Sequence, residues 1–215
     1  MRKFILFDLD GTLTDPAEGI TKSVAYALSA YGIEVSDRST LNCFIGPPLA
    51  ESFSVYFGFS ETDAKAAVDK YREYFSVTGL FENEVYDGIP EMLTALRNAG
   101  HVLAVATSKP TVFSDRILER FDLMKYFDYT LGSELDGRRV NKAEVIAEVM
   151  AHLGATPEDT LMIGDRKHDI IGATNCGIPA VGVLYGYGDE AELTAAGAAA
   201  LAVRPTDIPE LIRGL

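Results

Sequence analysis

The sequence predicts a doubly wound α/β fold, in which helices cover both faces of a parallel sheet, with an all-helical segment inserted after the first strand. Two observations support this prediction. After residue 88, short apolar stretches alternate with helical patterns, as in successive strand and helix units of a parallel sheet. Between residues 16 and 79, helical patterns follow one another and strand-like alternation is missing.

The first predicted strand begins at Phe4 and ends abruptly in two carboxylates, Asp8 and Asp10, followed by Gly11. A buried carboxylate is costly unless solvent or a cation compensates it. Ligands of open parallel sheets bind beyond the carboxyl ends of the strands, so we expect the reaction centre here. A plain Asp-Gly turn after a strand is the competing interpretation.

Phosphoryl transfer gives the two carboxylates different roles. One can attack phosphorus, while the other protonates the leaving oxygen and then activates water. We expect the chain to leave regular β geometry near Leu9, where Asp8 and Asp10 face one substrate. Gly11 permits that departure and a close approach of the backbone to phosphate oxygens.

The inserted segment contains three predicted helices, at Ala17 to Tyr31, around Pro48 to Phe57, and at Glu61 to Val77. The third carries an apolar stripe with helical spacing, formed by Ala64, Ala67, Val68, Tyr71 and Phe75. We therefore expect Tyr71 in the core. Lys70 and Arg72 lie off the stripe, where they are either solvated charges or residues that face a substrate.

The remaining predicted elements alternate in type. Helices are expected at Ile89 to Ala99, Pro110 to Phe121, Asn141 to Leu153, Lys167 to Cys176, Glu190 to Ala196 and from Thr206, and strands at His101 to Thr107, Phe127 to Leu131, Thr160 to Ile163, Ala180 to Leu184 and Ala200 to Val203. Polar residues again follow two of these strands. Thr107 and Ser108 suit phosphate oxygens, or Ser108 caps the next helix. Asp165 ends another apolar strand.

Lys142 begins a predicted helix, where a cation opposes the helix dipole. This unfavourable position indicates that Lys142 has a functional role. The alternative is a surface lysine without a role, as most lysines are. Asp165 and Asp169 could join Asp8 in holding a hard divalent cation through oxygen ligands. Asp169 could instead cap the helix that begins near Lys167.

Four segments together resemble the haloacid dehalogenase (HAD) superfamily in its phosphatase form. They are Asp8-Leu-Asp10-Gly-Thr-Leu-Thr-Asp15, Ala104-Val-Ala-Thr107-Ser108-Lys109-Pro110, Lys142, and Gly164-Asp165-Arg-Lys-His-Asp169, in the family's order. The resemblance implies a Rossmann-like core at residues 1–14 and 88–215 and a helical cap domain at 15–87, as in phosphoglycolate phosphatase-like members.

The resemblance also implies roles for these residues. Asp8 is the expected nucleophile, Asp10 the acid and base, and Lys142 the cation that offsets charge on the phosphoryl group. Gly11, Thr107, Ser108 and Lys142 are expected to bind the substrate phosphate. Mg²⁺ is the expected cofactor, with Asp8, the Asp10 carbonyl and Asp165 as ligands and Asp169 bound directly, bound through water, or supporting Lys142.

The expected function is Mg²⁺-dependent hydrolysis of small phosphate monoesters through an aspartyl phosphate, with phosphoglycolate as the first candidate substrate. A 5′-nucleotidase or pyrophosphatase, a phosphomutase and a non-catalytic protein that binds a phosphorylated ligand are the alternatives. A second aspartate and a phosphate-binding set argue against a dehalogenase.

The composition limits the partners. Lys and Arg number 19 against 32 Asp and Glu, which gives a net charge of −13, so we expect no nucleic acid and no anionic membrane as a partner. Cys43 and Cys176 form no Cys-x-x-Cys pattern, which is typical of a reducing cytoplasm. A cytoplasmic enzyme acting on a small phosphorylated metabolite is the resulting expectation.

Overall fold

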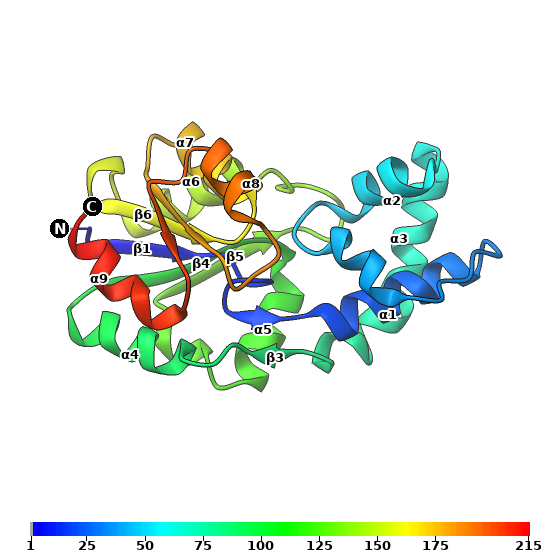
Figure 1. Cartoon of the computed structure of the whole chain (residues 1–215), viewed down its shortest axis with the longest axis horizontal. Helices are drawn as coiled ribbons and strands as arrows, with labels where there is room; N and C mark the ends of the chain where they lie inside the picture. The colour runs from blue at the N-terminus through cyan, green and yellow to red at the C-terminus, as the bar shows by residue number, and fades with distance from the viewer. Residues whose placement is uncertain (1) are drawn as a thin grey trace. The chain divides into compact units, whose positions relative to one another are not determined.

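The computed structural model describes residues 2–215, which divide into two compact units. The α/β unit consists of the N-terminal segment up to Asp15 together with Val85–Leu215. The helical unit spans Pro16–Glu84. The predicted α/β fold is confirmed by the parallel sheet of the first unit, which Figure 1 shows with helices on either side.

The sheet of the α/β unit has six strands in the order β5-β4-β1-β6-β7-β8. These are β1 (Phe4–Phe7), β4 (Val102–Pro110), β5 (Tyr129–Ser133), β6 (Thr160–Gly164), β7 (Ala180–Val183) and β8 (Ala200–Ala202). Strand β1 pairs in parallel with β4 on one side and with β6 on the other. The carboxyl ends of these three strands therefore meet at one edge of the sheet, where the predicted site residues follow them.

Helices cover both faces of this sheet (Figure 1). They are α4 (Ile89–Asn98), α5 (Thr111–Arg120), α6 (Lys142–Leu153), α7 (Lys167–Asn175), α8 (Glu190–Ala195) and α9 (Ile208–Arg213). On one face, α6 and α7 bury Val145, Ile146, Val149 and Ile170 against Leu6 and Met162 of the sheet. Burial of this apolar area fixes the first turns of α6 and α7 beside the ends of β1 and β6.

The helical unit contains α1 (Ala17–Ser29), α2 (Leu49–Phe57) and α3 (Glu61–Phe75), with 3₁₀ segments at Arg38–Phe44 and Gly79–Phe81. The predicted stripe of α3 is its packed face, because Ala64, Ala67, Tyr71 and Phe75 are buried. The expectation that Tyr71 lies in the core is confirmed, with 3% of its surface exposed. Lys70 and Arg72 lie off this face and form ion pairs with acidic residues of the same helix.

Three local features differ from the sequence-based expectation. Strand β4 continues past Thr107 to Pro110, with an irregular register after Ala106. Helix α5 begins at Thr111 after Pro110, which provides no side-chain cap, so the interpretation of Ser108 as a helix cap is wrong. The chain also forms two-residue strands, β2 (Thr14–Asp15) and β3 (Glu84–Val85), which pair with each other.

Within residues 2–215, no helix combines the length and the apolar character that crossing a membrane would require.

Candidate active site

The loop after β1 brings the paired carboxylates to the edge of the sheet. The Asp8 N–H still donates to the Ile163 carbonyl of β6 at 2.9 Å, and the chain then turns, with the Gly11 N–H donating to Thr14 O at 2.8 Å. Gly11 has φ +80°, a conformation that favours glycine. The expected departure from β geometry is therefore present, and both Asp8 and Asp10 are buried beyond the strand.

Lys142 is buried at the first position of α6, and its ammonium group meets three oxygens. Its Nζ lies 2.8 Å from Asp8 Oδ1 and 2.7 Å from Asp169 Oδ1, and it donates to the Ala106 carbonyl at 3.0 Å. Burial alone lowers the pKa of Lys142, but the two carboxylates outweigh that effect and raise it above its ordinary value. The cation that opposes the helix dipole is thus held beside the expected nucleophile.

Asp169 uses both of its carboxylate oxygens within the protein. While Oδ1 faces Lys142, Oδ2 accepts the Arg166 backbone N–H at 3.0 Å at the start of α7. A Cβ at Gly164 would lie 2.3 Å from the Asp169 carboxyl carbon, so glycine there makes room for this side chain. Of the roles left open by the sequence, the structure shows two, support of Lys142 and capping of α7.

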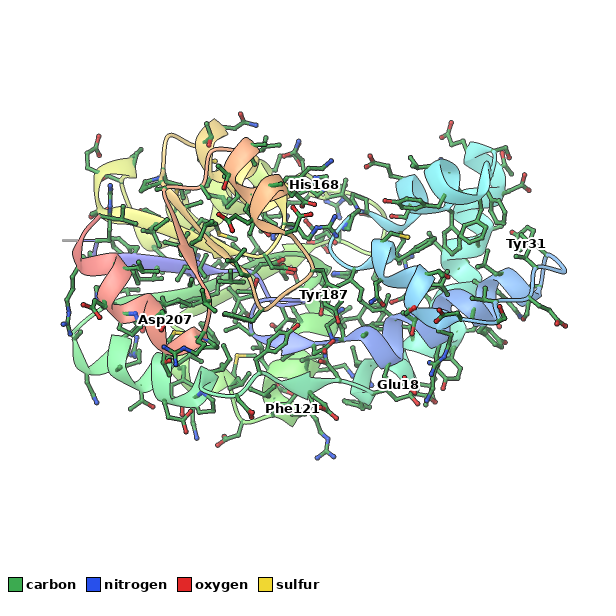
Figure 2. The ribbon with its side chains drawn as sticks, viewed as in Figure 1. Glu18, Tyr31, Phe121, His168, Tyr187 and Asp207 are labelled. Atoms are coloured by element: carbon green, nitrogen blue, oxygen red, sulfur yellow. The ribbon has the colours of Figure 1, made fainter. Side chains whose placement is uncertain are left out.

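Asp165 is fully buried at the end of β6 and is held by neutral donors. Its Oδ2 accepts the Tyr187 backbone N–H at 2.9 Å, and its Oδ1 lies 3.3 Å from the Thr12 hydroxyl. Tyr187, labelled in Figure 2, belongs to a glycine-rich loop after β7, and its hydroxyl bonds to Asp15. A Cβ at Gly186 would lie 2.4 Å from the Asp165 Cβ, which shows how closely this loop packs on the carboxylate.

The charges of Asp8, Asp165 and Asp169 are not balanced by Lys142 alone. One carboxylate oxygen from each aspartate lies within 4.8 Å of the others. Burial first, and then the other two carboxylates, raise the pKa of Asp165 well above its ordinary value. Buried oxygen ligands with unbalanced negative charge are the donor set that Mg²⁺ prefers, so these residues fit a divalent cation.

A second lysine, Lys109, lies beside Asp10. Its Nζ is 2.5 Å from Asp10 Oδ2, and the two side chains are only 6% and 10% exposed. Burial raises the pKa of Asp10, and Lys109 acts against that rise. In the sequence, Lys109 stands within the second motif and was assigned no role. The signal in the sequence that could have pointed to this residue is its position directly after Thr107 and Ser108, at the end of a predicted strand.

The expected phosphate-binding residues lie around the same strand ends. Thr107 is buried, and its hydroxyl accepts the Lys109 N–H at 3.2 Å, while the Ser108 carbonyl accepts the Ser133 hydroxyl at 2.8 Å. Arg166, which lies between Asp165 and Asp169 in the fourth motif, pairs with Glu192 at 2.9 Å. Its charge is therefore partly compensated by α8.

Comparison with known proteins identifies the family. The model of the haloacid dehalogenase-like hydrolase family matches residues 5–183, a range that contains Lys109, Lys142 and the aspartates Asp8, Asp10, Asp165 and Asp169. The chain belongs to the haloacid dehalogenase-like hydrolase family. The resemblance inferred from four separated motifs is thereby confirmed, as is the expectation of an enzyme of this family.

Similar proteins within the HAD-like hydrolases carry several names. A 5′-nucleotidase of Pseudomonas aeruginosa is 53% identical over 89% of this chain and 86% of its own length. A tyrosine-protein kinase of Mycobacterium tuberculosis, PtkA, is 41% identical over 86% of this chain and 63% of its own. A phosphoglycolate phosphatase of Vibrio parahaemolyticus is 28% identical over 86% of this chain and 85% of its own.

Among solved HAD-like structures, that of a predicted phosphatase from Clostridium acetobutylicum is 50% identical to this chain. It superimposes with a TM-score of 0.98 and covers 100% of both chains.

Proposed function

We propose that this HAD-like hydrolase is a Mg²⁺-dependent phosphatase of small phosphate monoesters that works through an aspartyl phosphate on Asp8. The contact between Asp8 and the buried Lys142 carries the proposal. A carboxylate oxygen beside a cation can attack phosphorus in line, and the same cation can balance the phosphoryl oxygens that meet it there.

The chain's own residues divide the remaining work. Asp10 would donate a proton to the departing alkoxide oxygen as the P–O bond breaks, and would then take a proton from the water that attacks the aspartyl phosphate. Thr107 and Ser108 would bind phosphoryl oxygens. The N–H of Gly11 already donates to Thr14 O, so Gly11 would contribute by letting the backbone approach the phosphate closely. Asp169 would keep Lys142 in place.

We propose Asp8, Asp165 and the Asp10 carbonyl as the groups that would hold Mg²⁺. Once bound, the ion would supply positive charge to the phosphoryl oxygens during transfer. One oxygen of Asp169 faces the Lys142 ammonium group and the other accepts the Arg166 N–H, whereas the partners of Asp165 are neutral donors. Because Asp169 already has a cationic partner, we place it outside the direct ligand set.

Nucleoside 5′-monophosphates are the first substrate class that we propose. The relative named as a 5′-nucleotidase is 53% identical to this chain, against 28% for the one named as a phosphoglycolate phosphatase. Phosphoglycolate, the first candidate from sequence, becomes the second. The helical unit is proposed to act as a cap whose side chains select between such substrates.

Phosphate release from a panel of substrates tests this function. Nucleoside monophosphates, phosphoglycolate, sugar phosphates, pyrophosphate and phosphotyrosine would be assayed with Mg²⁺ and with EDTA. We expect Mg²⁺-dependent release with the highest kcat/KM for a nucleoside 5′-monophosphate. Transfer of phosphate to a second alcohol instead of to water would indicate a phosphomutase, and no release from a folded, Mg²⁺-saturated protein would contradict the proposal.

A further inference from the structure

Lys109 lies in an irregular stretch of β4. A hydrogen bond within β4 and the close approach of β5 hold this stretch in place. The register of β4 against β5 shifts between Ala106 and Pro110, and the Thr107 hydroxyl accepts the Lys109 N–H inside this stretch. On the neighbouring strand, a Cβ at Gly132 would lie 2.0 Å from the Lys109 carbonyl oxygen. Only glycine at that position lets β5 approach the backbone of Lys109 so closely.

The two aspartates after β1 therefore each have a lysine of their own. Lys142 meets Asp8 from α6, and Lys109 meets Asp10 from β4. Both lysine side chains are buried, with 4% and 6% exposed. A buried ammonium group needs nearby acceptors, and the Asp10 carboxylate provides one for Lys109.

The contact with Lys109 makes the two oxygens of Asp10 different from each other. Oδ2 is held by the ammonium group, whereas Oδ1 is buried and accepts no hydrogen bond from residues 2–215. Buried polar oxygens usually have a partner, and the leaving group or the attacking water would provide one for Oδ1.

We propose that Lys109 is a positioning residue, which fixes Asp10 through Oδ2 so that Oδ1 is the oxygen that exchanges protons with the leaving group and with water. The proposal rests on the proposed phosphatase function. In the first step the proton moves from Oδ1 to the alkoxide oxygen as its bond to phosphorus breaks. In the second step Oδ1 takes a proton from water as the new O–P bond forms and the bond to Asp8 breaks.

This role differs from direct binding of the substrate. A lysine that bound phosphate would affect KM and inhibition by inorganic phosphate, since its contact would exist in the ground state. A lysine that positions Asp10 affects both proton transfers and leaves phosphate affinity unchanged. The second transfer, hydrolysis of the aspartyl phosphate, then becomes slow relative to its formation from a substrate with a good leaving group.

The test compares Lys109→Met with the wild type, Asp10→Asn and the double variant, all saturated with Mg²⁺ and assayed with p-nitrophenyl phosphate. For Lys109→Met we expect kcat to fall about 10- to 100-fold, the scale of a misplaced catalytic group, with inhibition by phosphate unchanged. A rapid burst of p-nitrophenol, one per enzyme, should precede the slow phase. The double variant should be no slower than Asp10→Asn, because both changes remove the same function.

Matched controls separate folding from function. Lys125→Met removes a lysine from an exposed ion pair of the same unit and should keep the wild-type rate. The double variant has no uncompensated charge at this position, so it remains informative if Lys109→Met unfolds.

Three results would overturn the inference while leaving the phosphatase function intact. They are a wild-type rate for Lys109→Met, a rise in KM and weaker phosphate inhibition at unchanged kcat, and a double variant slowed by the full product of the two single effects. A wild type that forms no phosphoenzyme and releases no phosphate would overturn both proposals together.

Discussion

Two ion pairs of equal length, one from each unit, differ in how far they are exposed to water. In the α/β unit, Lys142 lies 2.8 Å from Asp8, with both side chains less than 7% exposed. In the helical unit, Lys65 lies 2.8 Å from Glu61, with the side chains 69% and 86% exposed. Water competes for the second pair and leaves it little net stability. The first pair is desolvated, so each partner depends on the other. Distance alone therefore says little about what an ion pair contributes.

The largest effect is expected from Asp8, the buried carboxylate that we propose as the nucleophile. Asp8→Asn should lower kcat by about 10⁴-fold or more, because the change removes the carboxylate on which the proposed acyl phosphate forms. The same change removes one negative charge from a cluster with Asp165 and Asp169, so the Mg²⁺-free variant should melt at a higher temperature than the wild type. Phosphate release and thermal melts measure the two effects. A variant with the wild-type rate would show that Asp8 is not the nucleophile.

The comparison of lysines can be tested with matched variants. Lys142→Met leaves Asp8 and Asp169 buried without their cation, which should lower the free energy of unfolding by about 3–5 kcal/mol and abolish turnover. Lys65→Met, the exposed control, should change stability by less than about 1 kcal/mol and leave kcat unchanged. Urea unfolding monitored by circular dichroism would measure both. Equal losses in the two variants would contradict the distinction between buried and exposed pairs.

The direction in which stability changes with pH should differ between the metal-free protein and the protein saturated with Mg²⁺. Burial raises the pKa of Asp169 from 3.8 to about 6, even though Lys142 opposes the rise. Between these values the folded protein binds more protons than the unfolded chain, so this group makes the metal-free protein less stable as pH rises. The raised pKa of Asp165 acts in the same direction.

The proposed Mg²⁺ site requires the deprotonated cluster, so saturating Mg²⁺ should stabilise the protein more at about pH 7 than at about pH 5. Thermal melts at both pH values, with Mg²⁺ and with EDTA, measure this. Stability in EDTA that increases steadily with pH across this range would contradict the expectation.

The smallest effect concerns the helical unit alone. The Ser60 hydroxyl accepts the Asp63 N–H at 3.1 Å and caps α3, so Ser60→Ala should lower the free energy of unfolding by about 1 kcal/mol. Ser60→Thr keeps the hydroxyl and serves as the control. Chemical denaturation would detect the difference, and kcat on p-nitrophenyl phosphate should remain at the wild-type value in both variants.

Sequence patterns predicted the parts of the site that follow a strand directly. Asp8 and Asp165 each end an apolar stretch, and Lys142 begins a helix against its dipole, so local chemistry made all three conspicuous. The alternation of strands and helices likewise predicted the α/β fold, with most boundaries within a few residues. Strands β2 and β3 were missed because two residues are too few to show periodicity.

Other features depend on contacts between distant segments, which local patterns do not contain. Lys109 resembles any lysine near a strand end until the irregularity of β4 buries it beside Asp10. In the sequence, Gly172 resembles a glycine that only lowers the stability of its helix. In the fold, a Cβ there would lie 2.7 Å from Lys142 Cγ. The absence of a side chain at Gly172 therefore leaves room for the Lys142 side chain to reach Asp8.

Gly11 has a consequence for how this protein can vary over evolutionary time. Its φ of +80° already disfavours other residues, and a Cβ would lie 2.1 Å from Asp165 Oδ2. Any substitution at this position would therefore displace a carboxylate that belongs to a different motif, far along the chain. We therefore expect position 11 to tolerate substitution poorly as long as position 165 keeps its aspartate.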